Sequence, residues 1–204
     1  MKNLSIFLIV LLLSGCSTWS KVETPRITAE NKSFSIAAPN DWLRASFLNT
    51  KKSITTTKGD NKSVDVDRIV LTRDGLTLQT IDVCRLPSTD AFPHIGKKAT
   101  ETKLVSELAD LFVADLKGGE GLSNLDVLEI SPDSIAGHKG FRLRVQYKND
   151  RGLTFERLVF AFVKGEGFYY LSYQAPRIHY FKQYQRDFES VVNSFELSGS
   201  KKKS

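Results

Sequence analysis

The sequence predicts an α+β protein, and three observations indicate it. Short runs of alternating apolar and polar residues, separated by turn sequences, are typical of strands joined by hairpins. Apolar residues recur every three or four positions over residues 100–117 and 177–193, which predicts two amphipathic helices. The run LTFERLVFAFV at 153–163 is apolar at both alternating sets of positions, so this strand should be covered on both faces.

The first 15 residues are predicted to be a secretory signal. Lys2 supplies a positive start, residues 4–13 are apolar, and Ser14 and Gly15 are small. A helix that crosses a membrane needs roughly 20 apolar residues, so a stable transmembrane span is the weaker interpretation.

The end of this segment, Leu13-Ser14-Gly15-Cys16, resembles the lipobox of bacterial lipoproteins. The resemblance implies cleavage before Cys16 and lipidation of that residue, and Ser17 after it implies sorting to the outer membrane of a Gram-negative envelope, facing the periplasm. Each buried methylene contributes about 0.8 kcal/mol, so two or three acyl chains anchor a protein effectively permanently. The alternative is that Cys16 is only one more buried residue of the apolar segment.

The remaining chain divides into three parts. Ser, Thr, Lys and Glu dominate residues 16–31, which predicts a flexible linker that carries the lipidated cysteine. Residues 32–197 are long enough for one domain with a sizeable core. Residues 198–204, SGSKKKS, are expected to be a disordered Lys-rich tail that could touch anionic lipid headgroups or peptidoglycan.

The charge distribution argues against nucleic-acid binding. The formal net charge is +6, but Lys2 and the three lysines of the tail account for four of these charges and leave about +2 for the rest. That is an ordinary surface.

The first half of the domain predicts three strands. Phe34–Pro39 alternates and is followed by a turn and by Trp42, an aromatic residue expected to close one end of the core. Residues 49–63 are expected to form a polar loop, and residues 64–86 two strands joined by a turn at 72–75.

The second half is more regular. The helix at 100–117 has a cap candidate in Thr100 or Thr102, and Gly118-Gly119 ends it. Strands are then expected at 125–130, 141–148, 153–163 and 168–175, with turns at 137–140, 149–152 and 164–167, before the closing helix. The apolar stripe of this helix belongs in a core. It consists of Phe181, Tyr184, Phe188, Val191 and Val192, and Phe195 lies just beyond it.

The order of these elements resembles the PsbP-like superfamily, and within it the DcrB-type bacterial lipoproteins. The matching stretches are F-x-I-x-x-P-x-x-W from Phe34, I-x-G-x-x-G-x-R from Ile135, Y-x-x-x-x-G from Tyr147, YYLSY, and the closing F-x-x-x-x-x-x-F-x-x-V-x-x-SF from Phe181. The resemblance spans roughly residues 30–197 and implies an antiparallel sheet of about six strands sandwiched by helices. Members of the superfamily are mostly binding or accessory proteins: PsbP steadies the oxygen-evolving complex of photosystem II, and Mog-type members bind the GTPase Ran. The resemblance carries over no catalytic residues.

The candidates for chemistry are few. His94, His138 and His179 stand in separate contexts, and no metal-ligand spacing is present, so no metal and no cofactor are expected. Cys84 lies in a strand-like run and is expected to be a buried inert thiol. A Cys84 nucleophile with His94 as its base is the alternative, but no orienting third group is evident.

Arg142 and Arg144 are the candidate ligand-binding residues. Strand alternation places their side chains on one face about 7 Å apart, a geometry suited to a carboxylate, a phosphate or an acidic partner. Whether Arg157 of the next strand joins them depends on the hairpin register, which stays open. A solvated sheet face with ion pairs at its rim is the alternative.

We therefore predict a non-enzymatic, lipid-anchored protein of the bacterial cell envelope that binds or assists another envelope protein. The first alternative is a carrier or sensor of a small anionic ligand at Arg142 and Arg144. The second is a thiol-dependent hydrolase at Cys84.

Overall fold

The computed structural model describes residues 19–22, 24–46, 51–55, 61–100, 103–119 and 122–198. The predicted signal, Cys16 with Ser17, and the tail beyond residue 198 lie outside these ranges. Among the described residues, no helix is long and apolar enough to cross a membrane.

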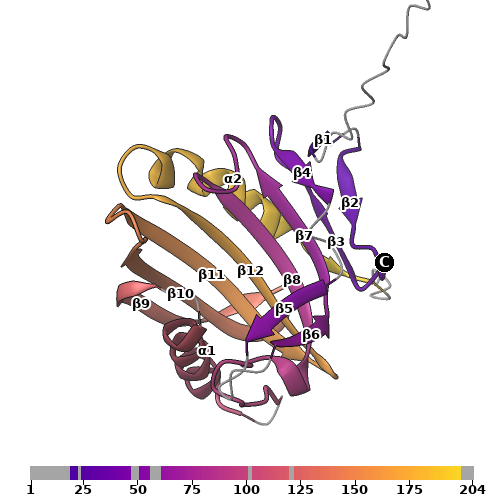
Figure 1. Ribbon diagram of the computed structural model, residues 1–204. Helices are drawn as coiled ribbons and strands as arrows, with labels where there is room; N and C mark the ends of the chain where they lie inside the picture. The colour runs from indigo at the N-terminus through magenta and orange to yellow at the C-terminus, as the bar shows by residue number, and fades with distance from the viewer. Residues whose placement is uncertain are drawn as a thin grey trace, which may run out of the picture.

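An antiparallel sheet of eight strands dominates the described part of the chain, with the order β1-β4-β7-β8-β12-β11-β10-β9 (Figure 1). In that order the strands are Trp19–Lys21, Leu43–Ala45, Asp67–Thr72, Thr80–Pro87, Gly167–Pro176, Thr154–Lys164, His138–Lys148 and Ser123–Ile135. A three-stranded sheet, β13-β3-β2, joins Glu196–Leu197, Phe34–Ala37 and Arg26–Thr28, and β5 (Lys51–Thr55) pairs with β6 (Asn61–Asp65). The two α-helices are α1 (Val105–Gly119) and α2 (Tyr180–Ser194), and a 3-10 turn covers Ser88–Asp90.

The two α-helices cover opposite faces of the large sheet (Figure 1). On β11, Val159, Ala161 and Val163 pack in the cluster that contains α1 residues. Leu158, Phe160 and Phe162 pack in the cluster that contains α2 residues. The prediction that this strand is covered on both faces is therefore confirmed.

The fold class predicted from the sequence is confirmed. The large sheet has eight strands rather than about six because β1 and β4, three residues each, extend it beyond β7. Trp42 does close one end of the α2-side core: it is 1% exposed, its Nε1 donates to Asp187 Oδ2 at 2.9 Å, and its ring meets Tyr173 and Tyr184 edge-on.

Two segments expected to be irregular form strands. Residues 16–31, the expected linker, contain β1 and β2, and Ile27 and Ala29 are buried. Residues 49–63, the expected polar loop, contain β5 and most of β6. In both cases polar composition hides strand pairing, because hydrogen bonds between backbones do not require apolar side chains.

Smaller differences concern turns and the start of a helix. Gly140 lies inside β10 rather than in a turn, and the position requires glycine because a Cβ there would stand 2.1 Å from the carbonyl oxygen of Ala161. The turn consists of Ala136 and Gly137, and the connection from β7 to β8 runs from residue 73 to residue 79. Helix α1 starts at Val105, which leaves Leu104 outside it and 67% exposed.

Strand β9 is one outer edge of the large sheet, since it pairs with β10 alone. Its pairing is interrupted by two register shifts, and Pro132 lies opposite Phe141. Val127, Leu128 and Ile130 are each at least 40% exposed.

Phe188 fixes α2 to the sheet, since it is fully buried and its ring meets Phe160 and Tyr173. We expect Phe188→Ala to lower the free energy of unfolding by about 3–5 kcal/mol, because it removes buried apolar surface and leaves a cavity. Urea denaturation measures the loss. Lys182→Ala, an exposed position on the same helix, is the control and should change stability by less than about 0.5 kcal/mol. Equal losses in the two variants would contradict the packing described.

Candidate functional site

A cavity of about 230 Å³ lies on the α1 side of the large sheet. Helix α1 packs over β9 and β10, so the sheet beyond it, on β7, β8 and β12, needs another cover. Part of that cover is the segment 88–99, which contributes Ala91 and Pro93 to the cavity wall. The remaining lining residues are Arg68, Thr80, Asp82, Leu86, Phe112, Asp115, Leu116, Arg157, Tyr170, Ser172 and Gln174.

Strand register brings the polar lining residues together. Asp82 lies opposite Ser172 on β12, and Gln174 lies between Thr80 of β8 and Arg157 of β11. Residues directly opposite one another in antiparallel strands point to the same face. The sheet floor of the cavity is therefore polar, on a face that is elsewhere apolar.

Arg68 and Asp82 form a two-pronged ion pair at one end of the cavity. Arg68 Nε donates to Asp82 Oδ1 at 2.7 Å, and Nη2 donates to Oδ2 at 2.8 Å. Burial on its own lowers the pKa of Arg68, but the charge and hydrogen bonds of Asp82 raise the pKa above its ordinary value. The guanidinium therefore stays charged.

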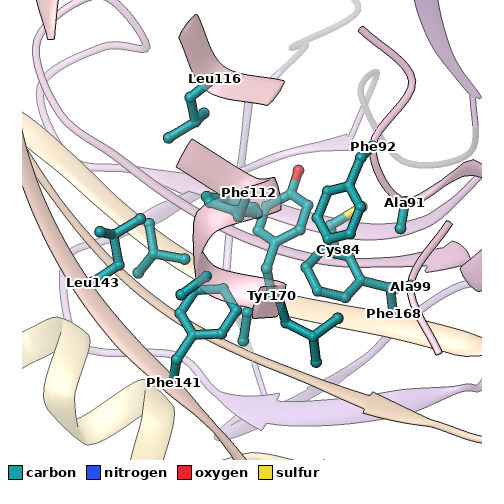
Figure 2. Close-up of a cluster of buried hydrophobic side chains, with 14 of the residues drawn as sticks. Cys84, Ala91, Phe92, Ala99, Phe112, Leu116, Phe141, Leu143, Phe168 and Tyr170 are labelled. Atoms are coloured by element: carbon teal, nitrogen blue, oxygen red, sulfur yellow. The ribbon is translucent and has the colours of Figure 1, made fainter. Parts of the chain in front are cut away.

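Tyr170 links this ion pair to the apolar core. Its hydroxyl donates to Asp82 Oδ2 at 3.1 Å, while its ring packs among the buried side chains of the α1 side, including Phe112 and Phe168 (Figure 2). This hydrogen bond thus fixes the Asp82 carboxylate relative to the buried ring of Tyr170.

Arg157 and Gln174 occupy the other end. Arg157 is 9% exposed, and its Nε and Nη2 donate to Gln174 Oε1 at 3.1 and 2.5 Å. The Tyr147 hydroxyl donates to the same oxygen at 3.0 Å, and the Arg157 guanidinium stands 5.4 Å from the Tyr147 ring centre. Because an arginine only donates, the amide of Gln174 must present its oxygen to Arg157.

The opposite wall is apolar and is held in place by one carboxylate. Phe112 and Leu116 of α1 line it together with Ala91 (Figure 2). Asp115 Oδ1 accepts the backbone N–H groups of His94 and Ile95 at 2.7 and 3.3 Å. The segment 88–99 is therefore tied to α1.

The predicted pair Arg142 and Arg144 lies on the other face, toward α2. Their register partners on β11 are Phe160 and Leu158, whereas Arg157 lies opposite Val145, so Arg157 does not join them. Arg142 pairs with Glu129 of β9. Arg144 Nε and Nη2 donate to Glu156 Oε2 at 2.9 and 2.5 Å, and the Glu156 side chain is 6% exposed. Both guanidinium groups are thus engaged by carboxylates from neighbouring strands.

Cys84 and His94 occupy different surroundings. Cys84 is 1% exposed and lies in the apolar cluster with Phe92 and Tyr170, so its predicted burial is confirmed (Figure 2). The His94 ring packs against the end of α1, where a Cβ on Gly119 would stand 2.1 Å from it. A buried thiol offers a substrate no access, which does not favour the hydrolase alternative. In the part of the chain that the structure describes, no three His, Cys, Asp or Glu side chains are grouped to hold a metal ion.

Arg68, Asp82 and Gln174 were not predicted from the sequence. A signal for one of them was present: Asp82 interrupts the apolar run of β8, just as Arg157, which stayed an open candidate, interrupts that of β11. A charged residue within a strand that is buried on both faces must be matched by a partner or face a cavity.

The described residues thus form an α+β protein in which a large antiparallel sheet, covered by one helix on each face, carries a polar cavity. No protein-family model and no curated protein matches the sequence. Among solved structures, cyanobacterial PsbP (CyanoP) from Synechocystis is similar, with a TM-score of 0.55 and 12% identity over 90% of this chain and 95% of that chain. The Ran-binding protein Mog1p from Saccharomyces cerevisiae is similar with a TM-score of 0.52 and 14% identity over 84% of this chain and 94% of that chain. The chain therefore has the fold that PsbP and Mog1p share.

We expect Asp82→Asn to lower the free energy of unfolding by about 1–3 kcal/mol, because Arg68, whose side chain is 18% exposed, would keep its charge in the cavity without its carboxylate. Urea denaturation at neutral pH measures this. The control is Glu129→Gln, which removes the charge of a carboxylate that is 42% exposed and should cost less than about 1 kcal/mol. If both variants lose the same stability, the Arg68–Asp82 pair has no special structural role.

Proposed function

We propose that this protein is a non-catalytic binding module, held in the bacterial cell envelope by a lipid on Cys16, which engages another envelope component through the polar cavity. The observation that carries the proposal is the set of charged and hydrogen-bonding side chains on the floor of a cavity whose surroundings are apolar. Burying such groups costs free energy, so their place in a hollow that a ligand can enter favours binding.

The contacts in the cavity favour binding over catalysis. Asp82 is paired with a permanently charged arginine, which stabilises its ionised form and makes it a poor proton donor. Arg157 is held by an amide, and Cys84 is 1% exposed and does not line the cavity. Such an arrangement supplies charge and hydrogen bonds to a ligand.

The lipobox resemblance supports the anchor. Strand β1 begins at Trp19, three residues beyond Cys16. An extended chain covers roughly 3.5 Å per residue, so a lipid on Cys16 would hold the β1 edge of the sheet about 10 Å from the bilayer surface. The proposed localisation is the outer membrane, facing the periplasm.

The shared fold supports an accessory role. Mog1p is described as a Ran-binding protein, so a fold of this kind serves partner binding in that case. For this chain the partner class we propose is an envelope protein.

A second candidate function, carriage or sensing of a small anionic ligand, is favoured by Arg68 and Arg157 in the cavity lining. The same function at Arg142 and Arg144 would require a ligand to compete with Glu129 and Glu156.

The anchor predicts that radiolabelled palmitate enters the protein in a Gram-negative host and that the label is lost in Cys16→Ser. The control is Cys84→Ser, which should keep the label. Unlabelled wild-type protein, or equal labelling of Cys16→Ser, would contradict the anchor.

The binding role predicts a position-dependent crosslink in cells. A photo-crosslinking amino acid at Thr77, an exposed residue of a hollow that adjoins the cavity, should give a defined adduct with one envelope protein. The same amino acid at Lys182, exposed on α2 on the opposite face, should not. Mass spectrometry identifies the adducts, and identical diffuse products from both positions would contradict the proposal.

A further inference from the structure

We propose that the centre of the polar cavity binds a carboxylate carried on a short apolar body. This inference rests on the proposed function, since it names the ligand class of the same cavity. The carboxylate would sit over Ser172 and Gln174 of β12, beside Arg157.

Two hydrogen-bond donors at this point have no partner among the described residues. Ser172 is 7% exposed and lines the cavity, yet its hydroxyl makes no hydrogen bond with another described residue. Gln174 Oε1 accepts from Arg157 and Tyr147, and the Nε2 amide group of this lining residue makes no hydrogen bond with another described residue. Both groups line the cavity and are open to water there, so a ligand that accepts a hydrogen bond from each would take the place of that water.

The charge of the site favours a singly charged acceptor. Arg157 brings a positive charge next to Gln174, whereas Asp82, which lies opposite Ser172, compensates the charge of Arg68. Two carboxylates, Asp82 and Asp115, also line the cavity and would repel a doubly charged phosphate more strongly than a carboxylate.

The size and the wall define the rest of the ligand. The cavity of about 230 Å³ suits a small molecule or a single side chain. Phe112, Leu116 and Ala91 present an apolar wall opposite the donors. A second hollow of about 470 Å³ shares Arg157 and Gln174 and includes Leu78, Leu153 and Phe155, so a longer ligand has room to continue there.

The first test is a ligand-observed NMR titration of the full mature protein in a non-ionic detergent. The probes are 4-methylpentanoate, its neutral amide 4-methylpentanamide, and inorganic phosphate. We expect saturable binding of the carboxylate and binding of the amide at least about tenfold weaker, because the amide lacks the charge. Equal binding of acid and amide, tighter binding of phosphate, or no binding of 4-methylpentanoate would overturn the inference.

Variants locate the binding. Ser172→Ala should weaken the binding of 4-methylpentanoate by about three- to tenfold, since it removes a neutral donor. Arg157→Gln should weaken this binding by at least about tenfold, since it removes a charged donor. Arg142→Gln, which removes an arginine from the opposite face, should change affinity by less than about twofold. If Arg157→Gln does not fold, the Ser172→Ala variant still tests whether the ligand binds at this site. Weakening by Arg142→Gln alone would overturn the assignment.

A peptide arm separates two sources of the carboxylate. The peptide N-acetylglycyl-leucine also ends in a carboxylate. If it binds more tightly than 4-methylpentanoate, the natural ligand is the C-terminus of a partner chain. The reverse order would indicate a free acid, and either order supports the site if the peptide amide binds at least about tenfold more weakly. A specific crosslink at Thr77 without binding of any carboxylate would overturn this inference and leave the proposed function standing. Carboxylate binding without a crosslink would overturn the partner role instead.

Discussion

The hairpin of β11 and β12 is the constraint on which the rest of the structure depends. Every residue from Phe155 to Val163 and from Gly167 to Tyr173 is buried, because one cluster packs on each face of these strands. Such strands must be apolar nearly throughout, and their neighbours β8 and β10 must supply matching side chains on both faces. The two helices then cover the faces that remain, α1 on one side and α2 on the other.

The same constraint explains why the polar residues of these strands are informative. Glu156 and Arg157 are adjacent in β11, so alternation sends one charge to each face. Glu156 forms ion pairs with Arg144 and Arg177 on the α2 side. Arg157 donates to Gln174 on the α1 side, where it lines the polar cavity. A charged residue in a strand that is covered on both faces thus either pairs with an opposite charge or lies at a cavity.

The sequence predicts the C-terminal half best because periodicity is strong there. The alternation of Phe141, Leu143, Val145 and Tyr147 with polar residues, and the two-faced pattern of β11, describe those strands well. The pairing of β2 and of the β5–β6 hairpin was not predictable, because polar composition favours a loop. Arg142 and Arg144 do share a face, but their carboxylate partners come from β9 and β11, and Arg68 meets Asp82 across another hairpin. These ion pairs between strands depend on the strand register, which cannot be predicted from the composition of the sequence.

The broken pairing of β9 affects how copies of this protein behave when they meet at high concentration. A long outer strand with exposed apolar side chains is a template on which another chain can add a strand. The two register shifts distort this strand, and Pro132 lacks an N–H group, so β9 is a poorer template for a second copy than a regular edge strand. The β9 edge is therefore less able to pair with the strands of further copies, which disfavours polymerisation of the protein at high concentration.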